Sequence, residues 1–331
     1  MDIWVNPYEI NVYPLHIAMK TLQIRAPDEL RSNADAVLEG IVLDMPSAIR
    51  LYLNKIVSNT LLLAIMCTLF CSIQAIASDG EEKQKTKIVL TSEIEWEPLN
   101  PARGENSPKA GTLWGDLNGT EATGFLVKFV DGFSSPPHIH NVTYRAVVIS
   151  GSIHNDDPKA EKMWMTSGSF WTQPKGEAHV TAAKGEKNIA LVEIDEGPYL
   201  VQHTHNAFDS GEYAVNIDAS NIVWVAPSGH HRILGGAKVA YLWGTPEAEL
   251  ENGTFIKLPA GFKGYIHSTG STFRVVTIKG QPEYLSDKKV TLTPGSYFSS
   301  SGDAMHQIQS EATQESIFYV RSNGSYRIIS K

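Results

Sequence analysis

Three histidines are the residues of this chain whose type and spacing could do chemistry. His138 and His140 lie two residues apart in a G-x5-H-x-H pattern that starts at Gly132, and His179 ends a G-x5-P-x-G-x2-H pattern that starts at Gly168. Alternate residues of a strand point to the same side, so His138 and His140 would face one way. Neutral imidazoles bind divalent transition metals, and three of them leave positions open for water, substrate or dioxygen. The spacing therefore predicts a three-histidine metal site.

The donor set does not identify the metal. One divalent transition ion is expected, and Fe, Zn, Mn and Ni are not distinguishable from three imidazoles alone. Tyr144 follows four residues after His140. A phenol with a pKa near ~10 is a poor ligand at neutral pH, so we expect Tyr144 to donate a hydrogen bond to a bound ligand or to fill the interior. It is the weaker candidate for a catalytic residue.

Both motifs recur later in the chain, with the ligands partly replaced. His267 follows His138 by 129 residues, whereas His306 follows His179 by 127, which indicates one two-residue deletion between the copies. Other landmarks repeat at the first offset: Trp114-Gly115 as Trp243-Gly244, Gly124 as Gly253 and Lys128 as Lys257. Thr269 replaces the second histidine, and Phe273 stands where the first copy has Tyr144. Two imidazoles without a third anchor bind metal weakly, so His267 and His306 are predicted to form a degenerate second site, structural or open to an organic ligand.

The chain from Ile88 onward has the pattern of an all-β protein. Short β-branched or aromatic runs are separated by Gly, Pro, Asn and Asp, with turn signals every eight to twelve residues, as in sandwiches and barrels. The polar stretch Tyr199–Ile217 is predicted to be a linker between two domains. Glu193 and Asp195 alternate on one strand and are predicted to lie on a solvated edge, with the barrel interior as the alternative. His154 is predicted to be a surface residue.

The two histidine motifs resemble the two motifs of the cupins. The resemblance covers about 90–325 in two copies, so the chain resembles a bicupin of the RmlC-like superfamily, within a bacterial group defined by its domain and not by a function. It implies two tandem jelly-roll barrels: 78–205 with an intact metal site and 206–331 with a degenerate one. It also implies a homo-oligomer, and a turn made by Pro174 and Gly176 that presents His179. The chain departs from the cupin pattern at Tyr144, where most members carry a glutamate ligand.

The N-terminal residues form a separate unit by their pattern. Residues 1–18 are unassigned. Residues 19–57 predict a strand and two short helices, and they resemble the ribbon-helix-helix region of RelB/DinJ-type antitoxins. That resemblance implies that Thr21, Gln23 and Arg25 face base edges in the DNA major groove. The family's toxin-binding tail is missing, so we interpret this segment as a vestigial fusion or a misassigned start rather than as a working DNA-binding domain.

An apolar run at 56–77 bears on location. It contains no charged residue, follows Arg50 and Lys55, and ends in the small-x-small sequence Ala75-Ile76-Ala77. This layout predicts a secretory signal peptide and a periplasmic or secreted protein. The run is also about the ~20 residues that span a bilayer, so an uncleaved membrane anchor is one alternative, and a buried helix is another. Both cysteines lie inside the run, so the remainder uses no disulfide.

Two functional classes are compatible with these patterns. The first is an exported metal-binding bicupin that acts as a metal-dependent oxygenase, such as a dioxygenase, on a small polar substrate. The second is a non-catalytic cupin sensor or ligand-binding protein, similar to the cupin domains of some anti-sigma factors. A third hypothesis, DNA binding, requires that residues 19–57 remain in the cytoplasm. The net charge of −8 argues against a protein that coats nucleic acid.

Overall fold

The computed structural model describes residues 86–226, 236–247 and 249–331. All of them belong to one compact unit, Lys83–Lys331. The ribbon-helix-helix-like segment at 19–57, with Thr21, Gln23 and Arg25, lies outside the described residues, as does the apolar run at 56–77; both remain predictions. Within the described ranges no helix is long and apolar enough to cross a membrane.

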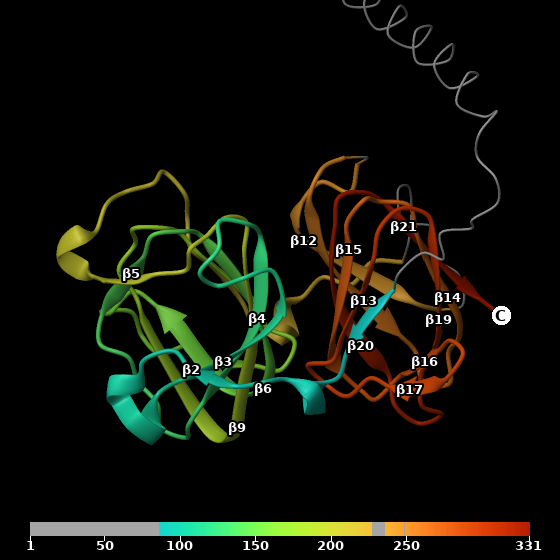
Figure 1. The fold of residues 1–331 in the computed structure, drawn as a ribbon, viewed down its shortest axis with the longest axis horizontal. Coiled ribbons are helices and arrows are strands. Elements are labelled where there is room, and N and C mark those ends of the chain that lie inside the picture. The colour runs from blue at the N-terminus through green and yellow to red at the C-terminus, as the bar shows by residue number, and fades with distance from the viewer. Residues whose placement is uncertain (1–85, 227–235, 248) are drawn as a thin grey trace, which may run out of the picture. The chain divides into compact units, whose positions relative to one another are not determined.

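The first barrel consists of one large antiparallel sheet and a two-stranded ribbon (Figure 1). From edge to edge the sheet contains β11 (Val215–Ile217), β8 (Phe170–Gln173), β6 (Tyr144–Asp156), β9 (Val180–Ile194), β4 (Thr123–Phe129), β3 (Lys109–Trp114) and β2 (Glu97–Pro98), with β7 (Met165–Thr166) paired to β6. The ribbon pairs β5 (His138–His140) with β10 (Val201–His203). In the described part of the chain, four short 3-10 helices occur in the connections: η1 (Thr91–Glu93), η2 (Pro101–Asn106), η3 (Thr204–Asn206) and η4 (Ala219–Asn221).

The second barrel is built from two antiparallel sheets. One contains, in order, β1 (Lys87–Val89), β18 (Tyr297–Ser300), β15 (Phe273–Lys279), β20 (Ser316–Ser322), β13 (Asn252–Leu258) and β12 (Lys238–Gly244). The other contains β17 (Lys289–Thr291), β16 (Glu283–Leu285), β19 (Ala304–Gln309), β14 (Lys263–Ser268) and β21 (Tyr326–Ser330). The prediction of an all-β fold with two jelly-roll barrels is confirmed.

Two edge strands tie the barrels together. β1 precedes the first barrel in the chain, yet it pairs with β18 of the second, with Lys87 opposite Ser299. In Figure 1 this cyan strand lies among the orange strands. β11 pairs with β8 of the first barrel. The stretch Tyr199–Ile217 is therefore not a free linker as predicted, because β10 and β11 within it add strands to the first barrel.

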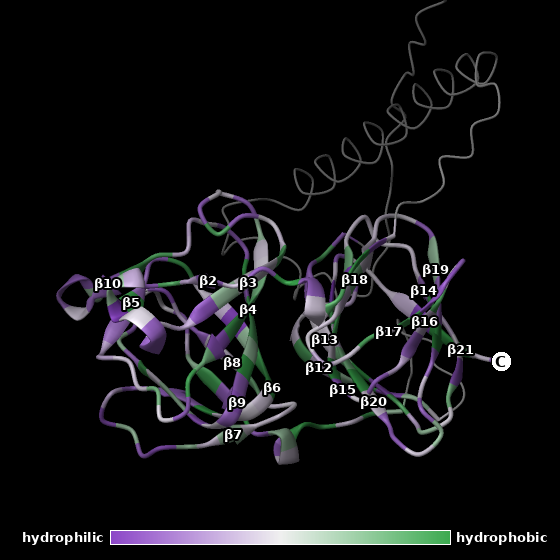
Figure 2. Ribbon diagram, turned by 60° about the horizontal axis from the view of Figure 1, so that its bottom comes forward, coloured by the Kyte–Doolittle hydropathy of each residue, from purple (hydrophilic) through white to green (hydrophobic). Residues whose placement is uncertain are grey.

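Consecutive apolar residues in the strands are explained by burial on both faces. Val148 of β6 and Val192 of β9 point into the first barrel, whereas their neighbours Val147 and Leu191 join a core shared by both barrels. The second barrel has its own interior core, which includes Val275. A sheet with one solvated face alternates apolar and polar residues, but one buried on both faces does not. Green, hydrophobic segments occur along strands of both barrels in Figure 2.

The repeated tryptophans and glycines are one local packing arrangement formed twice. Trp114 ends β3 opposite Gly124, and Trp243 lies near the end of β12 opposite Gly253, each after a register shift. A Cβ atom added to either glycine would lie within 2.0 Å of the facing indole ring. Only glycine leaves room for such a close approach. The repeat at an offset of 129 residues therefore reflects the same close contact between two neighbouring strands in each barrel.

Charged residues that were predicted to be solvated lie between the barrels. Glu193 is 1% exposed, and it accepts a hydrogen bond of 2.6 Å from the Tyr319 hydroxyl of the second barrel. Arg321 of β20 contacts Asp195 at 2.9 Å and Glu193 at 3.6 Å. The prediction of a solvated edge is wrong for Glu193, because the second barrel packs over it, whereas Asp195 remains half exposed at the rim. Arg145 of β6 adds a paired contact to Asp195, with atoms 2.9 and 3.0 Å apart.

Candidate metal centre

The two histidine motifs meet through backbone hydrogen bonds. The His138 amide donates to the His179 carbonyl at 3.1 Å, and the His179 amide donates back to His138 at 3.0 Å. The Gly176 amide donates to the His140 carbonyl at 2.8 Å, so the turn that contains Pro174 is fixed against β5. Gly176 has a φ of +77°, in the region that favours glycine. The second motif therefore presents His179 across from the first.

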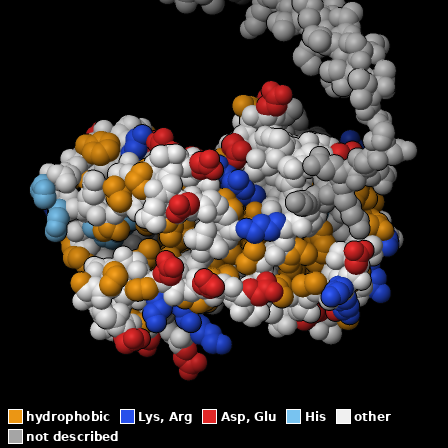
Figure 3. All heavy atoms as spheres, in the orientation of Figure 1, with side chains coloured by type: hydrophobic (Ala, Val, Ile, Leu, Met, Phe, Trp, Pro, Cys, Tyr) orange, Lys and Arg blue, Asp and Glu red, His pale blue; other side chains and the backbone are white. Residues whose placement is uncertain are grey.

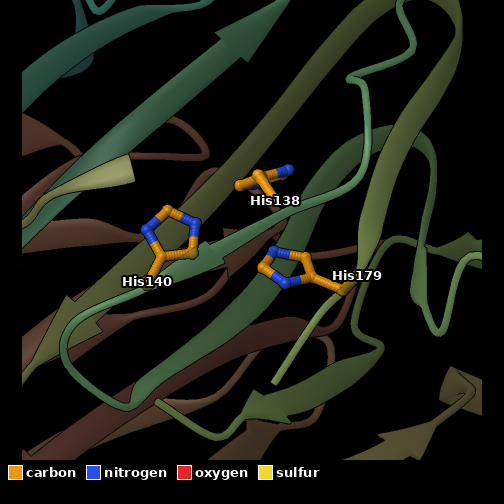
Figure 4. A group of neighbouring side chains, drawn as sticks. All are labelled: His138, His140 and His179. Atoms are coloured by element: carbon orange, nitrogen blue, oxygen red, sulfur yellow. The ribbon is translucent and has the colours of Figure 1, made fainter. Parts of the chain in front are cut away.

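The three imidazoles converge in the barrel. Their candidate ligand atoms all lie within 4.8 Å of one another, and the rings face a common centre in Figure 4. His140 and His179 are buried, whereas His138 is partly exposed at the open end. Within the described ranges, this is the one group of three potential metal-ligating side chains at such spacing. The structure thus brings the three predicted histidines together.

Each of these histidines is held by a backbone carbonyl behind it. The Nδ1 atoms of His138, His140 and His179 lie 2.9, 3.1 and 3.2 Å from the carbonyl oxygens of Pro136, Leu200 and Glu177. A carbonyl can only accept, so Nδ1 of each ring carries the proton. In the neutral ring Nε2 then keeps its lone pair, and the hydrogen bond fixes the orientation of the imidazole. All three rings therefore present Nε2 as a donor atom for a metal.

The surroundings keep these rings neutral. Burial lowers the pKa of His138, and it lowers the pKa of His179 to about 3, with a further contribution from the neighbouring His138 ring. The pKa of His140 lies well below its usual value because the ring is buried and because the two other imidazoles oppose a positive charge. A neutral imidazole is the form that binds a metal. No proton has to leave these rings at neutral pH before an ion binds.

A series of buried side-chain hydrogen bonds determines which group accepts the hydrogen bond from the Tyr144 hydroxyl. The Gln173 amide nitrogen donates to the Glu177 carbonyl at 3.2 Å, which turns the Gln173 oxygen towards the Asn155 amide nitrogen at 2.9 Å. The Asn155 oxygen therefore faces the other way and accepts from Thr181 at 2.7 Å and from the Tyr144 hydroxyl at 2.9 Å. Tyr144 thus donates to Asn155, and not to a ligand at the centre as was predicted.

The Tyr144 oxygen then adds a fourth acceptor to the site. It lies 3.4 Å from His179 Nε2, and neither atom has a proton to give the other. Acceptors that face one another in a buried space repel unless a proton or a cation lies between them. A divalent ion satisfies all three imidazoles at once, so the residues fit a metal ion. Burial raises the pKa of Tyr144, so its hydroxyl stays protonated.

Tyr199 is a site residue that the sequence analysis missed. Its ring stacks on His140, with centroids 4.4 Å apart, and its hydroxyl lies 3.3 Å from His140 Nε2. It comes from the stretch that was taken for a linker. The same stretch supplies the Leu200 carbonyl that orients His140. Strand periodicity could not place Tyr199, because its position depends on the chain folding back over β5.

A cavity of about 640 Å³ opens beside the three histidines. His138, His140, Tyr144 and Tyr199 form its inner end. Most of the remaining wall is apolar: Val127, Phe129, Phe133, Ala190, Val192 and Leu200 contribute to it. Histidine and apolar side chains gather on the surface at this end of the first barrel (Figure 3). The volume falls within the range of about 300–1,000 Å³ that small-molecule sites occupy.

The second barrel has a filled interior at the corresponding place. His306 is fully buried, with Nδ1 2.8 Å from the Tyr284 hydroxyl and Nε2 2.9 Å from the Ser300 hydroxyl. The Phe273 ring stacks on it, with centroids 5.4 Å apart. His267 bonds to Asp303 instead. Both ring nitrogens of His306 are therefore already engaged, and the predicted degenerate pair is separated into two local contacts.

His306 predicts a pH dependence of stability. Burial lowers its pKa from 6.5 to about 4, so the unfolded chain takes up a proton at a higher pH than the folded one. Stability is therefore full above about pH 6.5 and falls as the pH decreases to about 4, by an amount on the order of 3 kcal/mol. His306→Gln keeps a polar side chain and removes the titration. Urea unfolding of the metal-free protein at several pH values should show a shallower pH slope in the variant, and equal slopes would contradict this account.

His154 is not a surface residue, contrary to the prediction. It is 2% exposed on β6, and its ring centroid lies 6.2 Å from that of Trp164. It lies outside the three-histidine cluster. The prediction placed His154 in a turn after Gly151, but β6 continues through it and pairs with β9 in the same sheet, with His154 opposite Ala182.

Comparison with known proteins identifies the family and the fold. The family model of a domain of unknown function, DUF4437, matches residues 87–329. No curated protein matches the chain. A candidate dioxygenase from Nostoc punctiforme is 13% identical, with 76% of this chain and 86% of that chain covered and a TM-score of 0.56. The Ylba protein of E. coli is 13% identical, with 75% and 95% covered and a TM-score of 0.50. These likenesses show the cupin fold and do not extend to an activity.

Proposed function

Because the chain belongs to the DUF4437 family, whose fold here holds three converging imidazoles, we propose that the first barrel is a metal-dependent dioxygenase. The observation that carries the proposal is the set of three Nε2 lone pairs beside a cavity of about 640 Å³. Three protein ligands leave coordination positions open on that side. A small organic substrate in the cavity would meet the ion there.

The roles of the chain's own residues follow from their contacts. His138, His140 and His179 would hold one divalent ion, with their rings oriented by the three carbonyls. A redox-active ion would supply the capacity to bind dioxygen and exchange electrons. Tyr199 packs on His140 and closes one side of the centre. The apolar wall excludes water, which protects a reactive site from side reactions.

The composition of the cavity wall favours oxygenation over hydrolysis. No aspartate, glutamate or lysine contributes to the wall formed by the described residues. Hydrolysis and isomerisation usually need a positioned general base. Outside the metal triad the described wall offers one imidazole for that role, the exposed His203. Dioxygenation instead inserts both oxygen atoms into the substrate, which supplies the electrons. No further reductant is required.

Oxygen uptake tests the proposal. The full chain would be loaded separately with Fe(II), Mn(II), Ni(II) and Zn(II) and given a panel of enolic and aromatic acids under 18O2. We expect uptake with a redox-active ion and two labelled oxygen atoms in the product. Zn(II) should give no uptake, and neither should His140→Ala. Ligand binding without product for every ion would instead identify a sensor or binding protein.

We further propose that this centre works outside the cytoplasm. The support is the sequence alone, in which the apolar run 56–77 ends in a small-x-small cleavage pattern. Mass spectrometry of the protein from cells should find a mature N-terminus at Ser78. An intact N-terminus would contradict cleavage. It would instead favour the membrane anchor, or DNA binding through residues 19–57.

A further inference from the structure

Among the described residues, the cavity beside the metal centre has one permanently charged side chain, and it is positive. Arg103 of η2 lies at the wall, partly buried, with its guanidinium carbon 5.0 Å from the centroid of the Phe133 ring. Its Nη2 donates to the Ser134 carbonyl at 3.3 Å. Within the described ranges it makes no ion pair with a carboxylate. Most of the five N–H donors of this guanidinium therefore remain available.

The charge of the site is not balanced by the protein. Three neutral imidazoles leave the full charge of a divalent ion in place. Tyr144 stands where most cupins carry a glutamate, so the first barrel has no carboxylate at that position. No acidic side chain contributes to the part of the cavity wall that the described residues form. The partly buried Arg103 therefore has no carboxylate partner in the described wall, and the acid group of a ligand would supply its counter-charge.

We propose that the cavity selects an organic anion: a carboxylic acid whose acid group pairs with Arg103 and whose apolar body lies against Phe129, Phe133 and Val192. The inference rests on the proposed metal-dependent function and names its substrate class. The sequence led us to expect a small polar substrate, whereas the cavity suits a substrate that is polar at one end only.

The geometry of Arg103 suits a carboxylate. A guanidinium presents paired N–H groups that match the two oxygens of a carboxylate. The Phe133 ring supports the guanidinium by a cation–π contact and limits its rotation. The η2 helix that carries Arg103 contains Pro101, and the Asn100 side chain accepts from the Ala102 amide at 3.2 Å. The cation is thus placed by an ordered turn rather than by a free loop.

The wall argues against a phosphate or a sugar acid as the ligand. Such ligands carry polar groups along their whole length, and each would be buried without a partner against valine, leucine and phenylalanine. An aromatic or branched aliphatic acid buries its body favourably and keeps one charged end. Besides Arg103 and the histidines, few polar side chains contribute to the described wall, and most of it is apolar.

Calorimetry with phenylacetate and its neutral analogue phenylacetamide tests the inference. Full-length protein would be compared with Arg103→Gln, Arg103→Lys and the exposed control Arg327→Gln of the second barrel. We expect wild type to bind the acid at least about 10-fold more tightly than the amide. Arg103→Gln should lose about 10-fold or more for the acid and nothing for the amide. Arg103→Lys should fall between, since it keeps the charge and loses the paired donors. Arg327→Gln should behave as wild type.

The outcomes separate this inference from the metal-dependent function. Metal content is measured on the same samples. A protein that holds metal but binds acid and amide equally, binds neither, or is unaffected by Arg103→Gln overturns the anion site and leaves the metal centre standing. A protein without metal that still shows an Arg103-dependent preference for the acid supports the anion site and overturns the proposed reaction.

Discussion

Replacing His140 with alanine is expected to remove the metal from the protein. The residue supplies one of three Nε2 atoms, and it is the one whose ring contacts both Tyr199 and the Leu200 carbonyl. Substitutions of residues that only orient a ligand already cost about 10–100-fold in metal affinity, so the loss of a ligand should cost more than about 100-fold. Mass spectrometry of purified wild type should find about one equivalent of one ion, and His140→Ala should contain almost none.

The repeat provides a matched control for this experiment. His138 and His267 occupy corresponding positions of the two copies, but only His138 lies in the three-histidine cluster. His138→Ala should therefore lose the ion and His267→Ala should retain it. Unfolding of each variant without metal shows whether the barrel is intact, since truncating His140 leaves the partly buried Leu200 carbonyl without this hydrogen bond, at a cost of about 1 kcal/mol. Metal retained by His140→Ala in a folded protein would show that the centre does not use this ring.

The second large effect is expected at the interface of the barrels. Arg321 is buried and contacts Glu193, Asp195 and Glu251. Arg321→Met therefore removes the ion-pair partner of the buried Glu193 and leaves Arg145 as its remaining cationic neighbour. Breaking a buried ion pair by removing one partner costs about 3–5 kcal/mol. Urea unfolding should show a loss of this size. The exposed Arg327→Met should stay within about 0.5 kcal/mol of wild type.

The pH dependence of this loss has a definite sign. Burial raises the pKa of Glu193, and Arg321 and Arg145 oppose that rise. Without Arg321 the folded-state pKa rises further above the unfolded value, so the variant loses stability as the pH increases through that window. The deficit relative to wild type should be smaller at about pH 5 than at about pH 8. Glu193→Gln with Arg321→Met should recover part of the loss; no recovery would mean that packing, rather than charge, dominates.

The charged interface also shows where sequence patterns stop being informative. Glu193 and Asp195 alternate as residues of a solvated strand edge do, and nothing near them in the sequence indicates otherwise. Their partner Arg321 is more than a hundred residues away, on a strand of the other barrel. Whether a charged strand is solvated depends on what packs over it, and strand period carries no information about that.

The sequence by itself determined the barrels, the repeat and the three metal-ligating candidates. The spacing of His138 and His140 is enough to put both on one face of a strand, because strand geometry has a period of two. The glycines of the repeat report tight contacts between neighbouring strands, which are local in each barrel. Such features depend on short-range backbone geometry, which a sequence pattern records directly.

Only the tertiary structure decided how the centre is completed. Tyr199 reaches His140 because the chain folds back over β5, and Arg103 reaches the cavity from a helix outside the histidine motifs. The acceptor of the Tyr144 hydrogen bond is set by Asn155 and Gln173, which come from different strands. Hydrogen-bond direction and burial are properties of several distant segments together. No single stretch of the sequence contains them, so they emerge only when the strands pack.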